Sequence, residues 1–281
     1  MIVDVHSHYF RYPEHFSESF KEQSRRSRNG LEVDLTVRWQ QYHASATSCS
    51  KTIVFGGKAK LAGLWVPDTE VAAYVAQHPD NLIGFLSLDP AQPGWREELE
   101  HGHQHLKLRG IKLMPMYGGY MPNAREFDDL WAYATKHGLP VLAHTGTTFI
   151  DKAPLECTLP RLFDDVAIRF PDVKIILAHL GHPYEGECIA TIRKHKNVYA
   201  DCSALHYRPF QLYHSLMLLQ EYGVWSKLLF GSDYPFTTVD ESLAGMRKLN
   251  RMFEGSSQSR LDMEQMERMF ERDSLLLLGL T

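Results

Sequence analysis

The sequence is poor in cysteine and has no long apolar run. Its four cysteines, Cys49, Cys157, Cys188 and Cys202, form no C-x-x-C pair, and a chain of 281 residues does not need a disulfide framework in order to fold. We therefore expect reduced thiols and a cytoplasmic protein. No stretch approaches the roughly 18 apolar residues of a transmembrane helix. The N-terminal sequence MIVDVHSH lacks the basic and then apolar pattern of a signal peptide, so we expect neither a membrane span nor secretion.

An excess of charge of one sign is also absent. The chain has 30 lysines and arginines against 34 acidic residues, a net charge of −4. This balance gives no electrostatic footprint for nucleic acid or for an anionic membrane, so we expect a small-molecule substrate as the partner. Whether the chain forms a homodimer stays open. Histidine, in contrast, is abundant, with 15 residues, and such an abundance directs attention to metal ligands and acid–base groups.

Short apolar runs alternate with segments of helical spacing along the whole chain. Eight runs predict strands, at residues 2–6, 52–55, 82–88, 110–114, 140–144, 174–179, 198–202 and 228–233. Four helices are predicted between or after them, at residues 69–78, 124–137, 159–170 and 263–280, and we expect the last to complete the outer layer. Eightfold alternation favours a closed (β/α)8 TIM barrel over an open doubly wound sheet. We expect residues 1–281 to form one such domain.

The segment from about residue 10 to 45 is longer than a usual connection after a first barrel strand. It is rich in arginine, serine and glutamate, and it forms either a lid or substrate-binding insertion or a solvated surface excursion. Four of its arginines, Arg11, Arg25, Arg26 and Arg28, are candidates for holding a substrate carboxylate, although most arginines in such a loop are solvated.

His6 and His8 carry the strongest single signal for function. They end the first predicted strand, in VDVHSHYF, and residues two apart in an extended strand point to the same face. We expect both imidazoles at the C-terminal mouth of the barrel, where the active sites of such barrels lie.

Three further polar residues end other buried strands. His144 follows LPVLA, His179 follows KIILA, and Asp233 lies in LLFGSDYPF. A satisfied core histidine would explain any one of them, but several at one rim point to a metal, because buried polar groups need partners. Imidazole and carboxylate donors suit Zn²⁺, and also Mn²⁺, Fe²⁺ or Co²⁺.

Weaker candidates complete the set. Lys112 (in RGIKLMP) lies at the end of the fourth strand, and Tyr117 to Tyr120 follow it. Asp201 and Ser203 end the seventh strand, so all of these residues are candidates to line the mouth. The HGHQH run at residues 101–105 resembles a metal-binding tract, but it lies before the fourth strand, so we expect it on the surface.

The whole motif set resembles the amidohydrolase superfamily. HxH after strand 1, histidines after strands 5 and 6, and GSDYP after strand 8 are most similar to its "amidohydrolase 2" branch, which includes the aminocarboxymuconate-semialdehyde decarboxylase group. The resemblance implies that His6, His8, His144 and Asp233 bind one divalent metal, most simply zinc. It implies that His179, with Asp233, is catalytic and moves the proton of the water bound to that metal.

The role of Lys112 stays open at this point. In two-metal amidohydrolases a lysine at this strand is carbamylated and bridges two metals, in which case His144 and His179 would bind the second ion. The alternative is an ammonium group that pairs with Asp233 or with a substrate carboxylate.

The resemblance also leaves two reactions open. One is hydrolysis of an amide, lactone or ester by a metal-activated water. The other is non-oxidative decarboxylation of an aromatic or enoic acid. A third interpretation, a barrel without catalytic function, would leave several buried polar groups without a partner.

Overall fold

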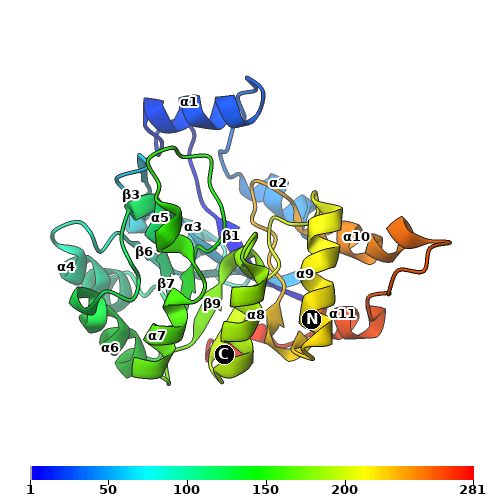
Figure 1. Cartoon of the computed structure of the whole chain (residues 1–281). Helices are drawn as coiled ribbons and strands as arrows, with labels where there is room; N and C mark the ends of the chain where they lie inside the picture. Colours follow the sequence, from blue (N-terminus) through cyan, green and yellow to red (C-terminus); the bar gives the residue numbers. More distant parts are fainter. Residues whose placement is uncertain (1) are drawn as a thin grey trace.

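The computed structural model describes residues 2–281, and parallel strands form its centre, with helices packed around them (Figure 1). The strands of the barrel are β1 (Ile2–His8), β2 (Cys49–Phe55), β5 (Leu82–Gly84), β6 (Leu86–Leu88), β7 (Ile111–Leu113), β8 (Val141–Ala143), β9 (Ile175–Leu177), β10 (Val198–Asp201) and β11 (Leu228–Leu229). β5 and β6 are interrupted only by Phe85, so together they occupy the single position predicted at residues 82–88. All eight predicted strands are therefore confirmed.

Hydrogen bonds link the strands into a ring. Regular pairing gives one group in the order β1–β2–β5 and another in the order β11–β10–β9–β8–β7–β6, all of them parallel. Phe85 joins the groups at one seam, because its N–H donates to the carbonyl oxygen of Val54 at 2.9 Å. At the other seam the N–H of Val5 donates to Phe230 (2.9 Å), and that of Asp233 donates to His6 (2.7 Å). The fold is the predicted (β/α)8 TIM barrel.

The interior of the barrel is filled by apolar side chains from most of its strands. These are Val3, Val5, Ile53, Phe55, Ile83, Phe85, Leu142, Ile176, Tyr199 and Leu229, with Ala178 just beyond β9. Strand interiors of this kind are typical of parallel sheets buried on both faces. The barrel is thus a solid core, and open space for chemistry is confined to its ends.

The outer layer consists of helices that follow the strands. They are α3 (Asp68–Gln77), α4 (Trp95–Glu100), α6 (Asp128–His137), α7 (Leu162–Arg169), α8 (Glu185–Lys194), α9 (Pro209–Glu221), α10 (Val239–Arg247) and α11 (Met263–Phe270). Helix α6 shows why the prediction succeeded. It buries Leu130, Trp131 and Ala134 on one face and ends at Gly138, which takes up the left-handed conformation (φ 65°). No helix within residues 2–281 is long and apolar enough to cross a membrane.

The prediction of one outer helix over residues 263–280 was wrong. The chain breaks after α11, and the side chain of Asp273 caps a new helix, α12 (Ser274–Leu278), by accepting a hydrogen bond from the N–H of Leu276 at 3.0 Å. Leu275 and Leu278 of α12 join the interior apolar cluster. The end of the chain therefore packs against the inner core of the barrel and does not extend the outer layer.

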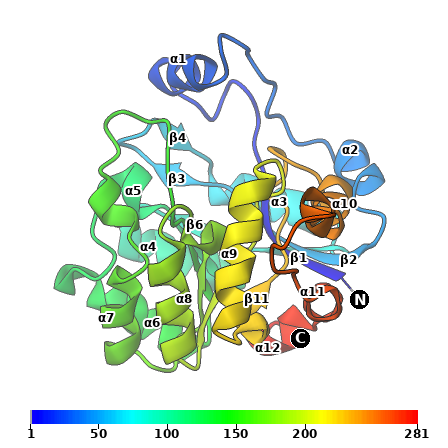
Figure 2. The same cartoon turned by 45° about the vertical axis from the view of Figure 1, so that its right-hand side comes forward.

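The insertion at residues 10–45 forms helices α1 (Glu18–Ser27) and α2 (Trp39–Ala44). Helix α1 lies across the end of the barrel opposite α12 (Figure 2). It is held there by Phe20, whose ring lies 5.5 Å from that of Phe149, and by Gln23, whose side-chain oxygen accepts a 2.7 Å hydrogen bond from the N–H of Asp151. Both partners belong to the loop after β8, so the insertion covers the mouth of the barrel as a lid.

Candidate metal centre

A bulge in β1 brings both histidines of the HxH motif into the barrel. Against β2, the register of β1 shifts between Asp4 and Ser7, so that β1 contains one extra residue. An extra residue in a strand changes which side chains face inward. Val5 therefore packs in the interior, while the next residue, His6, also faces inward, with its ring 5.1 Å from that of Phe55.

The outer nitrogen of each motif histidine is fixed by a neighbour. His6 Nδ1 lies 2.9 Å from Oδ2 of the buried Asp201, and His8 Nδ1 lies 3.1 Å from the carbonyl oxygen of Gly56. Because both partners can only accept a hydrogen bond, Nδ1 carries the hydrogen in each ring and Nε2 is left to face the mouth. The two Nε2 atoms converge on Oδ1 of Asp233, at 3.2 Å each.

Asp233 is positioned by an unusual backbone. Its φ of 67° lies in the left-handed region, which costs energy for a residue other than glycine, and its N–H donates to the carbonyl oxygen of His6. Burial alone would raise the pKa of its carboxyl group. The neighbouring rings of His6 and His8 outweigh burial and hold that pKa well below its usual range, so Asp233 is an anion.

His179 stands beside His6 and has the same kind of strained backbone, with φ 58°. Its N–H donates to Oδ1 of Asp201 at 3.0 Å, and its Nδ1 lies 2.8 Å from Oγ of Ser203. His6, His179 and Asp233 each offer one ligand atom, and these atoms all lie within 4.8 Å of one another. Burial lowers the pKa of His179 to about 4, so the ring is neutral at pH 7.

His144 completes the histidine cluster from the end of β8. Its ring lies 5.2 Å from that of His179 and 4.9 Å from that of Tyr117, a buried residue of the short helix α5 (Pro115–Gly118). Its Nε2 lies 3.3 Å from the carbonyl oxygen of Thr147. Burial, reinforced by His179, holds the pKa of His144 well below its usual range.

Lys112 of β7 ends inside the same cluster. Its side chain is fully buried, with Nζ 3.4 Å from Nε2 of His6 and 4.5 Å from the ring centre of Phe55. Within residues 2–281 no carboxylate oxygen lies within 4.0 Å of Nζ. Burial lowers the pKa of Lys112 to about 8. The expected alternative of an ion pair with Asp233 is therefore absent from the structure, whereas that of a substrate carboxylate remains.

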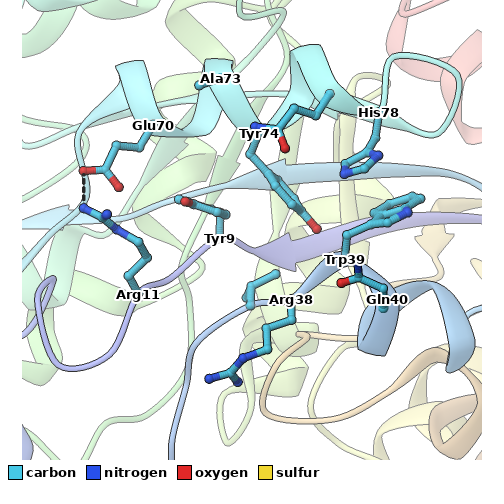
Figure 3. Close-up of a pocket in the computed structure, with 11 residues that line it drawn as sticks. Tyr9, Arg11, Arg38, Trp39, Gln40, Glu70, Ala73, Tyr74 and His78 are labelled. Atoms are coloured by element: carbon cyan, nitrogen blue, oxygen red, sulfur yellow. Dashed lines mark hydrogen bonds and ion pairs between the residues drawn. The ribbon is translucent and has the colours of Figure 1, made fainter.

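Arg11 lies outside the mouth. It lines an open cavity of about 590 Å³ between α3 and the insertion, together with Tyr9, Tyr74 and Trp39 (Figure 3). Its guanidinium group donates to Oε1 of Glu70 at 2.9 Å. Among the candidates for substrate binding, the structure brings Lys112 and Tyr117 to the cluster and places Arg11 on another face of the insertion.

One further histidine run lies away from the site, whereas His182 lies next to it, with its N–H donating to the carbonyl oxygen of His179 at 2.9 Å. The 101–105 run forms one irregular helical turn after α4, and within it His103 contacts the hydroxyl of Tyr133 at 3.0 Å. His101 and His105 are exposed, as expected for a surface tract. His182 is bound by Glu185 at 2.7 Å.

Asp201 plays a larger part than its sequence position indicated. One of its oxygens holds His6, and the other accepts from the backbone N–H groups of His179 and Ser203. The sequence placed it only among residues lining the mouth. Its position at the end of a buried strand was the available signal, but the partners that give it this role are distant in the chain.

The donor set fits a divalent metal ion. Imidazole nitrogens and one carboxylate oxygen converge, and the nitrogens on the far side of His6, His8 and His179 are held by other groups, as is usual for histidines that bind metals. In addition, His6 lies between two carboxylates, Asp201 and Asp233, an arrangement that favours positive charge at this point.

The combination of a TIM barrel with a cluster of histidines and an aspartate at its mouth is characteristic of one class of enzymes. The chain belongs to the amidohydrolase family, whose model (Amidohydro_2, described as Amidohydrolase) matches residues 3–278. The resemblance found from the motifs is thereby confirmed. No curated protein sequence matches the chain.

Solved structures show the same fold. An uncharacterized TIM-barrel protein from Bordetella bronchiseptica is similar with a TM-score of 0.76 and 18% identity, over 99% of this chain and 98% of that one. A probable 2-pyrone-4,6-dicarboxylic acid hydrolase from Acinetobacter baumannii, with citric acid bound, gives 0.66 and 14%, over 99% of both chains. A 5-carboxyvanillate decarboxylase from Novosphingobium aromaticivorans, with bound manganese, gives 0.66 and 15%, over 100% of this chain and 97% of that one.

Proposed function

We propose that this protein is a metal-dependent hydrolase acting on an amide, lactone or ester of a small molecule. The observation that carries the proposal is the convergence of the Nε2 atoms of His6 and His8 on Oδ1 of Asp233, with the neutral ring of His179 beside them. In this proposal His6, His8, His144 and Asp233 hold one divalent ion. Zn²⁺ is our first choice, and Mn²⁺, Fe²⁺ and Co²⁺ suit the same donors.

A divalent ion bound here would polarise the substrate carbonyl and lower the pKa of a coordinated water towards 7. The protein supplies the proton transfers. His179 has a pKa of about 4 in the metal-free protein, so its Nε2 is free to accept a proton at neutral pH. Ser203 and Asp201 hold the other side of this ring and its backbone, which keeps Nε2 directed at the reacting atoms. The proton would then pass to the leaving group.

Decarboxylation of an aromatic or enoic acid is the second candidate. It is favoured by Lys112, a buried cation at the cluster without a carboxylate partner in residues 2–281, since such a group can receive the carboxylate of a substrate. A manganese-bound decarboxylase is also among the proteins of similar fold.

A substrate panel separates the two reactions. Metal-loaded protein is incubated with lactones, esters and amides, and in parallel with hydroxylated aromatic acids. Hydrolysis is followed by incorporation of ¹⁸O from labelled water, and decarboxylation is followed by release of CO₂. We expect ¹⁸O in the product and a loss of turnover in Asp233→Asn. Release of CO₂ without any hydrolysis would establish the second candidate.

The proposal includes a small-molecule substrate, no nucleic-acid or membrane partner, and action in the cytoplasm. A homodimer is compatible with it.

A further inference from the structure

The insertion carries a partly buried arginine without an ionic partner among residues 2–281. Arg28, directly after α1, is partly buried, and within residues 2–281 no carboxylate oxygen lies within 4.0 Å of its guanidinium group. Burial lowers its pKa, and the titratable groups that influence it are the hydroxyls of Tyr207 and Tyr12. A charge that is partly removed from water and has no counter-charge is stabilised when an anion binds to it.

Three other arginines of the insertion lie next to acids, and a fourth, Arg26, is exposed to water. Arg11 pairs with Glu70 at 2.9 Å, and Arg38 pairs with Asp34 at 2.8 Å; both lie around the outer cavity (Figure 3). Arg25 lies 3.9 Å from Glu32, whose carboxylate also accepts a hydrogen bond from Tyr12. Glu32 is therefore already bound by Arg25 and Tyr12, and it forms no ion pair with Arg28.

One aromatic ring connects Arg28 with the metal centre. The guanidinium carbon lies 5.6 Å from the ring centre of Phe236, and the same ring stands edge-on to His8 at 6.1 Å. Tyr207 influences the pKa of both Arg28 and the buried Tyr117, which packs against His144. Arg28 is thus on the lid side of the mouth, with one aromatic ring, that of Phe236, between it and His8.

We propose that Arg28 binds a carboxylate group of the substrate, so that the substrate class is a carboxylate-bearing lactone, ester or amide. The inference rests on the proposed function for the position of the reacting bond. A guanidinium group is suited to this task, because it can donate two parallel hydrogen bonds to one carboxylate while its face stays on Phe236. The carbonyl at the metal centre and the carboxylate at Arg28 would then fix the substrate at two points.

Binding of two matched probes tests this proposal without requiring turnover. Isophthalate offers one carboxylate to the metal centre and a second to Arg28, whereas 3-carbamoylbenzoate replaces the second by a neutral amide of the same shape. Titration calorimetry is carried out with metal-loaded protein. The variants are Arg28→Gln, Arg28→Lys and, as a control on the same helix, the exposed Arg26→Gln.

We expect wild type and Arg26→Gln to prefer isophthalate by about 10- to 100-fold, the contribution of a charge-assisted hydrogen-bonded pair. Arg28→Gln should abolish that preference, and Arg28→Lys should retain part of it. Equal binding of the two probes by wild type, or an unchanged preference in Arg28→Gln with its stability alone altered, would overturn the proposal. The experiment measures binding and not hydrolysis, so its result does not depend on whether the proposed reaction takes place. Failure of the proposal for Arg28 can therefore be distinguished from failure of the proposed function.

Discussion

Asp201 shows how one buried carboxylate can organise a whole site. It binds Nδ1 of His6, in β1, and the backbone N–H of His179, which follows β9. Burial would raise its pKa, but the charge and the hydrogen bond of His6 keep that pKa well below its usual range. Asp201 is therefore a fixed anion that sets the orientation of two rings.

Replacing Asp201 by Asn should weaken metal binding while leaving the fold intact. An amide keeps the shape but loses the charge and one acceptor, so His6 is no longer held in a single tautomer. Loss of a carboxylate behind a histidine ligand typically lowers metal affinity about 10- to 100-fold. The affinity is measured by competition with a chromophoric chelator. The control is Asp89→Asn, at a buried acid that accepts hydrogen bonds from the backbone N–H groups of Lys60 and Ala91. An unchanged metal affinity in Asp201→Asn would show that the carboxylate does not act through the ligand.

At the scale of elements, we expect the insertion to control access to the site. Helix α1 is capped by Ser17, whose Oγ accepts a hydrogen bond from the N–H of Phe20, and the helix is held to the loop after β8 by Phe20 and Gln23. Few other contacts hold α1 in place, so we expect opening of the lid to cost less free energy than unfolding of the barrel.

Gln23→Ala should speed up loss of the metal to a chelator. The variant removes two side-chain hydrogen bonds. The one with Ser19 lies within α1 and is lost from the open and the closed lid alike, whereas the one with Asp151, worth about 1 kcal/mol, is lost from the closed lid alone, which favours opening by about fivefold. The rate of metal removal by excess EDTA is compared with that of Glu22→Ala, an exposed neighbour on the same helix. Equal rates for the two variants and wild type would mean that the lid does not limit access.

The element scale also separates what the sequence can and cannot predict. The strand ends at His144, His179 and Asp233 were predictable, because a buried apolar run followed by a polar residue is a local pattern. The bulge in β1 was not, since it depends on the register against β2, which is about 45 residues away. The break before α12 was missed because Leu275 and Leu278 fit an outer helix equally well by spacing, and their packing into the barrel decides the matter.

At the scale of the whole molecule, folding buries several histidines and disfavours their protonated form, so the stability of the metal-free protein depends on pH. In the metal-free protein, burial lowers the pKa of His8 and of His179 from 6.5 to about 4, and His144 moves in the same direction. As the pH falls, the unfolded chain therefore binds protons at these histidines at a higher pH than the folded protein does. The resulting stability is present above pH 6.5 and is lost as the pH falls towards 4. His6, whose pKa is raised, acts in the opposite direction.

We expect the unfolding free energy of the metal-free protein to fall between pH 7 and pH 5. A shift from 6.5 to about 4 corresponds to a loss of about 2 kcal/mol per histidine at pH 5. Urea denaturation at several pH values measures this dependence, and His8→Gln should flatten the slope by the share of one histidine. A slope in His8→Gln equal to that of wild type would contradict the assignment of a lowered pKa to His8.

The central claim is that one divalent ion is held by His6, His8, His144 and Asp233, and that His179 transfers protons without being a required ligand. The most direct test is the metal content per chain, by mass spectrometry of the elements, in wild type, His179→Asn and Lys112→Ala. The account predicts close to one ion in all three, with turnover in His179→Asn lowered about 10²- to 10⁴-fold. Two ions in wild type and one in each variant would contradict it, because His179 and a carbamylated Lys112 would then bind a second metal.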